Sequence, residues 1–201
     1  MLRGRDIKRY SYDFADLWLI NTHNRIKEKG ITPIDLNNYP AIKSHLDQYY
    51  FELEKRQDKG ITPYNLRNCA YMDDFSKQKI VWGNLNISAA YTIAPEGYFV
   101  NAPYPMIVPA NKYLLGVLNS KVADYYIRNL GVTRNGGYFE YKPMFIEQLP
   151  VPVIVESEQE ELIQIVEKLL DKNCDFDFEV NRVVYKLYNF SSEEINLIES
   201  Q

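Results

Sequence analysis

The sequence predicts an α+β fold, in which a mixed small sheet packs against helices and a C-terminal helical tail follows. Short apolar runs separated by glycine and proline predict strands, and apolar residues at three- and four-residue steps predict helices. Hydrophobic residues make up 46% of the 201-residue chain, which is enough to form a folded core. We therefore divide the chain into a main domain, residues 1–155, and a helical tail, residues 156–201, that packs on it.

The first hundred residues carry most of the predicted strands and one helix. The apolar run at residues 16–22 is typical of a buried strand. Residues 39–58 have the apolar spacing of a helix, and Pro40 fits its first turn. Turn residues separate three further predicted strands, at residues 79–84, 89–93 and 98–100.

The second half of the chain is predicted to be mainly helical. A long amphipathic helix is expected at residues 111–128, with Asn111 as its cap. A glycine-rich loop at Gly136-Gly137 follows. After the break at Pro150 and Pro152, helices are expected at residues 158–170, at residues 178–188, and after the capping signature Ser191-Ser192-Glu193-Glu194.

Composition narrows the class of protein. Every apolar run is shorter than the ~20 residues needed to span a membrane. The N-terminus lacks the basic-then-apolar pattern of a secretory signal. Cys69 and Cys174 are too few and too far apart for a disulfide framework or a zinc site. We therefore expect a cytoplasmic protein with no membrane partner and no metal of its own.

Charge is distributed unevenly along the chain, whose formal net charge is −4. From Glu156 onward there are 12 acidic and 4 basic residues, whereas the preceding part holds 15 acidic and 19 basic ones. The acidity therefore belongs to the tail, and the rest is mildly basic. Such a distribution is compatible with a phosphate-binding face and equally with two ordinary solvated surfaces.

The most distinctive part of the chain is residues 111–152, NKYLLGVLNSKVADYYIRNLGVTRNGGYFEYKPMFIEQLPVP. A helix, a glycine loop, an aromatic-polar alternation and a proline-punctuated exit follow one another. This order resembles the C-terminal specificity domain, or target-recognition domain, of TaqI-like restriction-modification enzymes and N6-adenine DNA methyltransferases, which is related to type I restriction specificity subunits. The opening residues 2–10 and the tail residues 178–195 resemble the beginning and the end of that domain.

The resemblance implies sequence-specific recognition of double-stranded DNA. The chain would direct a methyltransferase or endonuclease, present as a further domain or subunit, to its target site. That component would methylate adenine with S-adenosylmethionine and could require Mg²⁺, whereas this chain alone is expected to hold no cofactor and to be no catalyst. The alternative is an interaction or specificity subunit that docks a separate modification subunit through its acidic tail.

DNA contact requires cations and polar donors on loops. The best candidates are in the glycine loop, because Arg134 can pair bidentately with guanine and Asn135 with adenine. Gly136 and Gly137 would let the backbone approach a ligand closely, although they could equally close a simple turn. The other candidates are cations in four places: Arg128 beside the loop, the cluster Arg3, Arg5, Lys8 and Arg9, the cluster Lys55, Arg56 and Lys59, and the pair Lys77 and Lys79.

Two motifs suggest chemistry that the rest of the chain does not support. Asn101-Ala102-Pro103-Tyr104 nearly spells the Asn-Pro-Pro-Tyr element that grips a flipped adenine, but no cofactor-binding domain precedes it, and a turn is favoured. Asp124 with Glu140-Tyr141-Lys142 mimics the carboxylates and lysine of metal-dependent nucleases. Because Asp124 lies inside an amphipathic helix, we keep a nuclease domain as the minor alternative.

A short repeat stands apart from these motifs. Lys29-Gly30-Ile31-Thr32-Pro33 recurs thirty residues later as Lys59-Gly60-Ile61-Thr62-Pro63. Two copies are too few for a solenoid. The repeat therefore predicts two similar turns.

Overall fold

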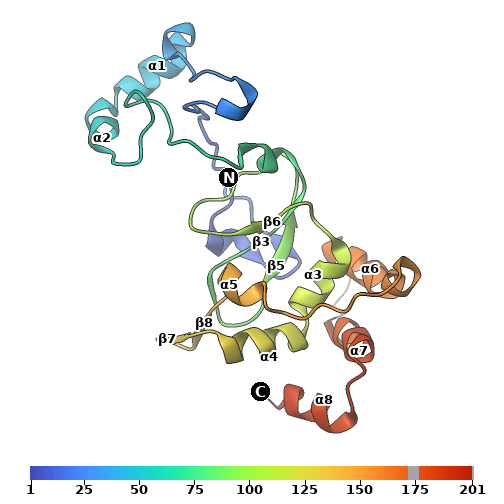
Figure 1. The fold of residues 1–201 in the computed structure, drawn as a ribbon. Helices are drawn as coiled ribbons and strands as arrows, with labels where there is room; N and C mark the ends of the chain where they lie inside the picture. Colours follow the sequence, from blue (N-terminus) through green and yellow to red (C-terminus); the bar gives the residue numbers. More distant parts are fainter. Residues whose placement is uncertain (172–176, 201) are drawn as a thin grey trace. The chain divides into compact units, whose positions relative to one another are not determined.

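The computed structural model describes residues 1–171 and 177–200, apart from the side chain of Glu28; Cys174 lies outside them. The chain forms two compact units. Unit 1 comprises Met1–Leu17 and Asp73–Gln201, and unit 2 comprises Trp18–Met72. The sequence-based boundary at residue 155 falls within unit 1 and stays a prediction. Figure 1 shows the elements of each unit.

The strands of unit 1 form small antiparallel sheets. β3 (Lys79–Trp82) is central in one sheet and pairs with β5 (Tyr91–Ala94) and β6 (Met106–Ile107). β8 (Tyr138–Glu140) is central in another and pairs with β4 (Leu85–Asn86) and β7 (Thr133–Arg134). β1 (Ile7–Lys8) pairs with β2 (Ser11–Tyr12) after a short 3₁₀ turn, η1 (Gly4–Asp6). Together with the helices, these sheets confirm the α+β prediction.

The predicted helix at residues 111–128 is two helices, α3 (Lys112–Asn119) and α4 (Lys121–Leu130). The Asn111 cap is confirmed, since its side chain accepts a hydrogen bond from the Leu114 N–H. Ser120 interrupts the helix because it takes an extended conformation and caps α4 by accepting from the Ala123 N–H. The buried Asn119 side chain fixes the break by exchanging two hydrogen bonds with the Tyr91 backbone.

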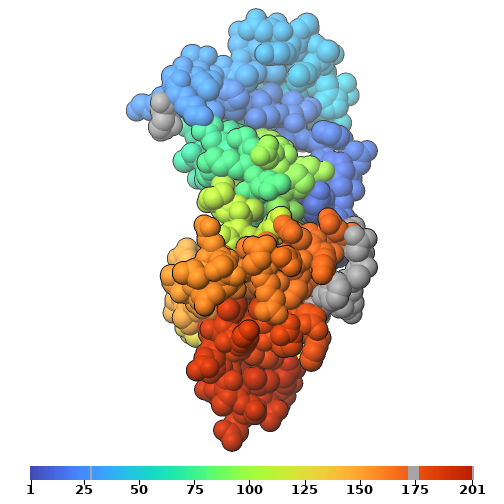
Figure 2. Space-filling model, turned by 90° about the vertical axis from the view of Figure 1, so that its right-hand side faces the viewer, coloured from blue at the N-terminus to red at the C-terminus, as the bar shows by residue number. Residues whose placement is uncertain are grey.

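The tail helices belong to the main core of unit 1. α6 (Glu156–Leu170) lies against α3, where Gly116 permits contact with Leu162. α7 (Asp177–Leu187) packs against α3, α4 and α6, and α8 (Ser192–Glu199) packs against α4. Ser191 and Glu194 form the expected capping box of α8. Figure 2 shows the red C-terminal helices directly against the orange segment around residue 150.

Unit 2 is built around polar side chains. The buried Asn65 amide donates to the Ile34 carbonyl, and the Asn24 side chain accepts from the Ile61 N–H at 2.8 Å. These bonds connect segments in and beside the two repeated turns, and Pro33, Thr62 and Pro63 of those turns line one pocket of about 430 Å³. The helical elements of unit 2 are short: η2 (Lys27–Lys29), η3 (Leu36–Asn38), α1 (Pro40–Asp47) and α2 (Tyr50–Lys55). A further 3₁₀ turn, η4 (Met72–Ser76), begins at the last residue of unit 2 and belongs mostly to unit 1.

Three further predicted elements differ from the structure. Residues 16–22 and 98–100 form no strand. Around Asp16 the chain has a positive φ of 53° and passes from unit 1 to unit 2, so no ladder forms. The helix predicted at residues 39–58 is divided at Tyr49, whose backbone leaves the helical region, although Pro40 does occupy the first turn of α1. In the part of the chain that the structure describes, every helix is too short or too polar to cross a bilayer.

Candidate nucleic-acid interface

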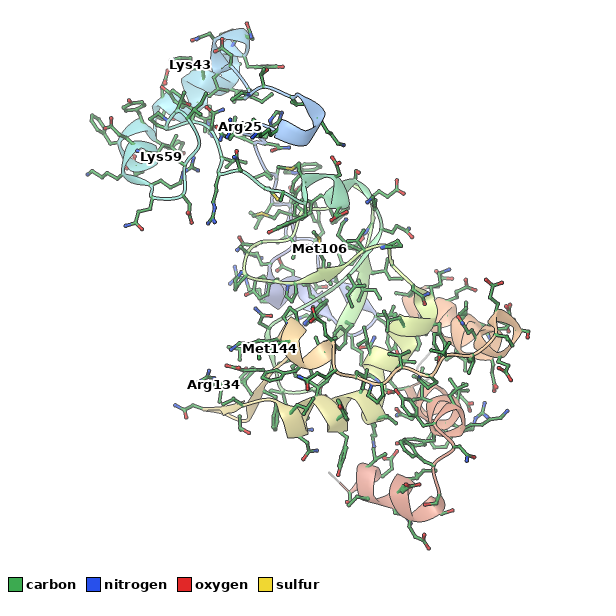
Figure 3. The ribbon with its side chains drawn as sticks, in the orientation of Figure 1. Arg25, Lys43, Lys59, Met106, Arg134 and Met144 are labelled. Carbon is green, nitrogen blue, oxygen red and sulfur yellow. The ribbon has the colours of Figure 1, made fainter. Side chains whose placement is uncertain are left out.

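The glycine loop closes an exposed β-hairpin. β7 and β8 pair Arg134 with Tyr138, and Asn135, Gly136 and Gly137 form the loop between them. Both glycines have positive φ angles, 81° and 79°, which L side chains rarely adopt. All residues from 132 to 138 are exposed. The hairpin begins just after α4 ends, and Figure 3 places the labelled Arg134 at its outer end.

The Arg134 side chain is held by the buried carboxylate of Glu140. The Arg134 Nε donates to the Glu140 Oε1 at 2.7 Å, and its Nη2 donates to the same oxygen. Lys142 pairs with the other oxygen at 2.7 Å. These donors, Lys142 first and Arg134 second, lower the pKa of Glu140. Glu140 is 5% exposed, whereas the Arg134 side chain is 54% exposed.

This arrangement orients Arg134 without using all of its donors. A guanidinium carries five N–H groups, and two of them face Glu140. Three N–H groups remain directed elsewhere on an exposed side chain. Asn135 is exposed as well, and its side-chain amide forms no hydrogen bond within the described residues. The outer end of the hairpin therefore offers the two side-chain types that read base edges.

Arg128 of α4 contacts the hairpin through Phe139. Its guanidinium lies 4.1 Å from the centre of the Phe139 ring and pairs with Asp124 at 3.2 Å. The aromatic residues divide as strand alternation requires: Tyr138 is exposed, Phe139 is partly buried, and Tyr141 is fully buried. Arg128 is therefore partly occupied by structural contacts, and Arg134 is the better placed of the two for a ligand.

The carboxylates of the nuclease alternative have structural partners. Asp124 accepts hydrogen bonds from the Ala89 N–H at 2.7 Å, from the Tyr141 hydroxyl and from Arg128. Glu140 is held by Arg134 and Lys142. Within residues 1–171 and 177–200, no group of three or more histidine, cysteine, aspartate or glutamate residues is arranged to hold a metal ion. The geometry offers no support for a nuclease centre here.

The N-terminal basic cluster is partly neutralised. Arg3 forms two hydrogen bonds with the buried Asp6, at 2.8 Å each, and these lower the pKa of Asp6. Arg9 pairs with Asp177 at 2.9 Å, which ties the cluster to α7. Arg5 and Lys8 are exposed, and the Lys8 ammonium donates only to the Arg5 carbonyl. Arg5 and Lys8 are thus the cations of this cluster that are available for a phosphate.

Of the remaining cations that were predicted to contact DNA, some are exposed and some are held by other contacts within the protein. Lys79 is a correction: its side chain is fully buried and its ammonium donates to the Pro95 carbonyl at 3.0 Å. Arg56 in unit 2 donates to the Pro63 and Asn65 carbonyls and holds a turn. Lys77 pairs with Asp74 at 3.0 Å but is half exposed. Lys55 is exposed at the end of α2.

The element that resembles the adenine-gripping motif is a turn, as predicted. Asn101 donates its N–H to the Leu2 carbonyl, and the Pro103 carbonyl accepts from the Asn84 side chain. The Tyr104 ring packs against Gly4, where an added Cβ would lie 2.1 Å from it. The ring is therefore occupied by the protein itself. Sequence reasoning missed the role of Glu140 as the support of Arg134, and that of Lys142 as the second partner of Glu140.

One comparison with known proteins identifies the family of this chain. The profile of the family described as the TaqI-like C-terminal specificity domain matches residues 1–151, well over half of the chain. No curated protein matches it. The family supports a role in DNA target recognition within restriction-modification enzymes and association with their catalytic component. On this match, and with an exposed arginine-asparagine hairpin in the matched region, the chain belongs to the family of TaqI-like C-terminal specificity domains.

Proposed function

We propose that this chain reads a specific double-stranded DNA sequence with the β7–β8 hairpin and directs an adenine-N6 methyltransferase or endonuclease to it. The observation that carries the proposal is the exposed Arg134, held by the buried Glu140 beside the exposed Asn135. A two-stranded ribbon fits the major groove, which is about 12 Å wide. There Arg134 would pair with guanine and Asn135 with adenine.

Arg134 held by Glu140 should discriminate between bases better than an arginine without such a partner. A guanidinium fixed along one edge has lost part of its rotamer freedom before it meets DNA, so less entropy is lost on binding. With two of its N–H groups held by Glu140, the guanidinium has fewer orientations in which the other three can meet a base edge. Glu140 therefore acts as a positioning residue for Arg134.

Phosphate contacts would set the register of the hairpin on the duplex. Arg5 and Lys8 in unit 1 are exposed candidates, and the exposed Lys77 could exchange its partly buried partner Asp74 for a phosphate. Lys55 would add a contact from unit 2. Each such contact should add about one unit to the slope of log affinity against log salt.

Catalysis would lie with the partner component. S-adenosylmethionine, and Mg²⁺ where cleavage occurs, would bind to that component. The Asp124 and Glu140 carboxylates would keep their structural roles throughout. The chain alone would then bind DNA weakly, because the catalytic component supplies further contacts.

The proposal can be tested by selecting duplexes from a random pool with the chain, alone and with its catalytic component, at low salt. We expect one sequence motif to be enriched. Replacing Arg134 and Asn135 together by alanine should weaken binding to that motif. The loss of the arginine alone should account for about 1–3 kcal/mol of binding free energy. The double variant should also accept other bases at one or two positions of the DNA motif.

Arg182→Ala is the matched control, since Arg182 is an arginine 48% exposed that also pairs with glutamate, but it lies on α7. It removes the same charge and should leave the selected motif unchanged. Failure to enrich any motif, with or without the partner, would refute the proposal. If the double variant selected the same motif as the wild-type chain, the part of the proposal that assigns DNA reading to the hairpin would be refuted.

The conformation of the loop gives a second test. Gly137→Ala forces an alanine to a φ near 79°, whereas Gly97→Ala imposes the same strain at 77° in a different turn. Neither added Cβ would meet an atom within 4 Å, so backbone strain is the shared effect. We expect both variants to lose similar stability and only Gly137→Ala to lose selective DNA binding. Equal DNA binding by both variants would mean that the base-reading residues lie outside the β7–β8 hairpin.

A further inference from the structure

An apolar groove lies on the side of α4 that faces α8. It has a volume of about 310 Å³ and is lined by Tyr125 and Tyr126 of α4, Pro150 of the exit segment, and Phe190 and Leu197 of the C-terminal region. Figure 1 shows α8 next to α4 at this end of unit 1. Leu197 is 54% exposed although it belongs to this lining. The groove therefore leaves large carbon surfaces in contact with water.

This surface remains after the tail has packed on the core. The apolar stripes of α6 and α7 are used internally, since Leu162, Val166, Val183 and Val184 are buried in unit 1. The groove between α4 and α8 stays open.

The charge around the groove is acidic. Glu194 lines it and Glu193 precedes Glu194 on the exposed first turn of α8. From residue 187 onward the chain contains three glutamates and no lysine or arginine. Lys121, at the start of α4, is paired with Glu199, so its charge is already offset. An occupant with cations beside its apolar side chains would match both features.

We propose that this groove docks a basic amphipathic helix of the catalytic component. One or two large apolar side chains of that helix would fill the groove, and flanking lysines or arginines would face Glu193 and Glu194. The proposal rests on the proposed function for the identity of the partner, and on the groove itself for its chemistry. The groove lies on α4, and the reading hairpin follows directly from the end of the same helix.

The test uses a synthetic 18-residue helical peptide with leucine on one face and lysine on the others. Two matched peptides carry glutamate in place of lysine or alanine in place of leucine. Binding to the full chain is measured by calorimetry and by amide chemical shifts. We expect only the lysine-leucine peptide to bind, with shift changes around Tyr126 and Leu197.

Leu197→Gln should weaken the binding of this peptide about tenfold, because it removes an apolar side chain that lines the groove. Val155→Gln is the matched control, since Val155 is an aliphatic residue 63% exposed that lies outside the groove and outside the β4–β8–β7 sheet. It should leave peptide affinity unchanged. Both variants should keep the DNA motif selected by the wild-type chain, so failure of docking and failure of DNA reading remain distinguishable.

Three outcomes would overturn the proposal. The first is no binding by any of the peptides. The second is equal affinity for the lysine and glutamate peptides, or for Leu197→Gln and the wild type. The third is self-association of the chain that Leu197→Gln abolishes, which would make a second copy the occupant of the groove.

Discussion

The hydrogen-bond centre at Asp124 offers the sharpest test of the structure. One of its oxygens accepts from the Ala89 N–H and from the Tyr141 hydroxyl, and both donor residues are buried. Its other oxygen accepts from Arg128 at 3.2 Å. Trp82 donates to the Tyr141 carbonyl at 2.7 Å, so a buried tryptophan lies beside this centre.

Asp124→Ala would leave two buried donors without an acceptor. Each unsatisfied buried group costs about 1–3 kcal/mol, so the expected loss is about 2–6 kcal/mol. The contact with the partly exposed Arg128 adds less than about 1 kcal/mol. Asp124→Asn keeps an oxygen for both buried donors and should cost only about 1–2 kcal/mol. Against a typical total stability of about 5–15 kcal/mol, the alanine variant should be close to unfolding.

Urea unfolding followed by tryptophan fluorescence measures this difference. The chain has two tryptophans, so a Trp18→Phe background leaves Trp82 as the reporter for unit 1. A loss below about 1 kcal/mol for Asp124→Ala, or equal losses for both variants, would refute the reasoning. Normal stability combined with loss of Mg²⁺-dependent DNA cleavage would instead favour the nuclease alternative.

Further predictions concern burial, packing and protonation. Lys79→Met should leave DNA binding unchanged and stabilise the chain by up to about 1 kcal/mol at neutral pH, because it removes a buried ammonium. Burial lowers the pKa of Lys79, so wild-type stability rises as pH rises through that lowered value, and the advantage of methionine measured by urea unfolding should shrink at alkaline pH. Gly116→Ala would place a Cβ 2.8 Å from Leu162 and should cost about 1–3 kcal/mol, seen as a lower Tm. Because the pKa of Glu140 is lowered, its contribution is present above the ordinary glutamate value of about 4.3 and is lost as pH falls through the lowered value. Amide signals of the hairpin should therefore lose dispersion in acid, and Glu140→Gln should remove that pH dependence.

Local chemistry made parts of the fold predictable. Asn111, Pro40 and the capping box of Ser191 and Glu194 occupy the expected positions, because a cap depends on residues only three places apart. The break between α3 and α4 was not predictable, because Ser120 follows a continuous apolar periodicity. It depends on Asn119 bonding to Tyr91, a strand residue 28 positions away.

The candidate site shows the same limit. Residue type indicated Arg134 and Asn135, but the partners of the cations are set by tertiary structure. Arg9 meets Asp177 across 168 positions in the sequence, and Lys79 is buried because β3 is the central strand of its sheet. Nothing in the spacing of these residues distinguishes them from the exposed Lys8. Predicting DNA contacts from cation clusters therefore overestimates the cations that can reach a phosphate.

α4 connects the two surfaces to which we assign functions. Asp124 and Arg128 are one helical turn apart and face the sheets and the hairpin. Tyr125 and Tyr126 line the groove toward α8. Because both sets of residues stand on one helix, a substitution that shifts α4 would disturb the support of the hairpin together with the groove, and a loss of DNA binding could not then be assigned to either one. Leu197 lies on α8 and is half exposed, so its replacement changes the groove while the Asp124 and Arg128 contacts remain. If Leu197→Gln nevertheless altered the selected DNA motif, the groove and the hairpin would be coupled through α4.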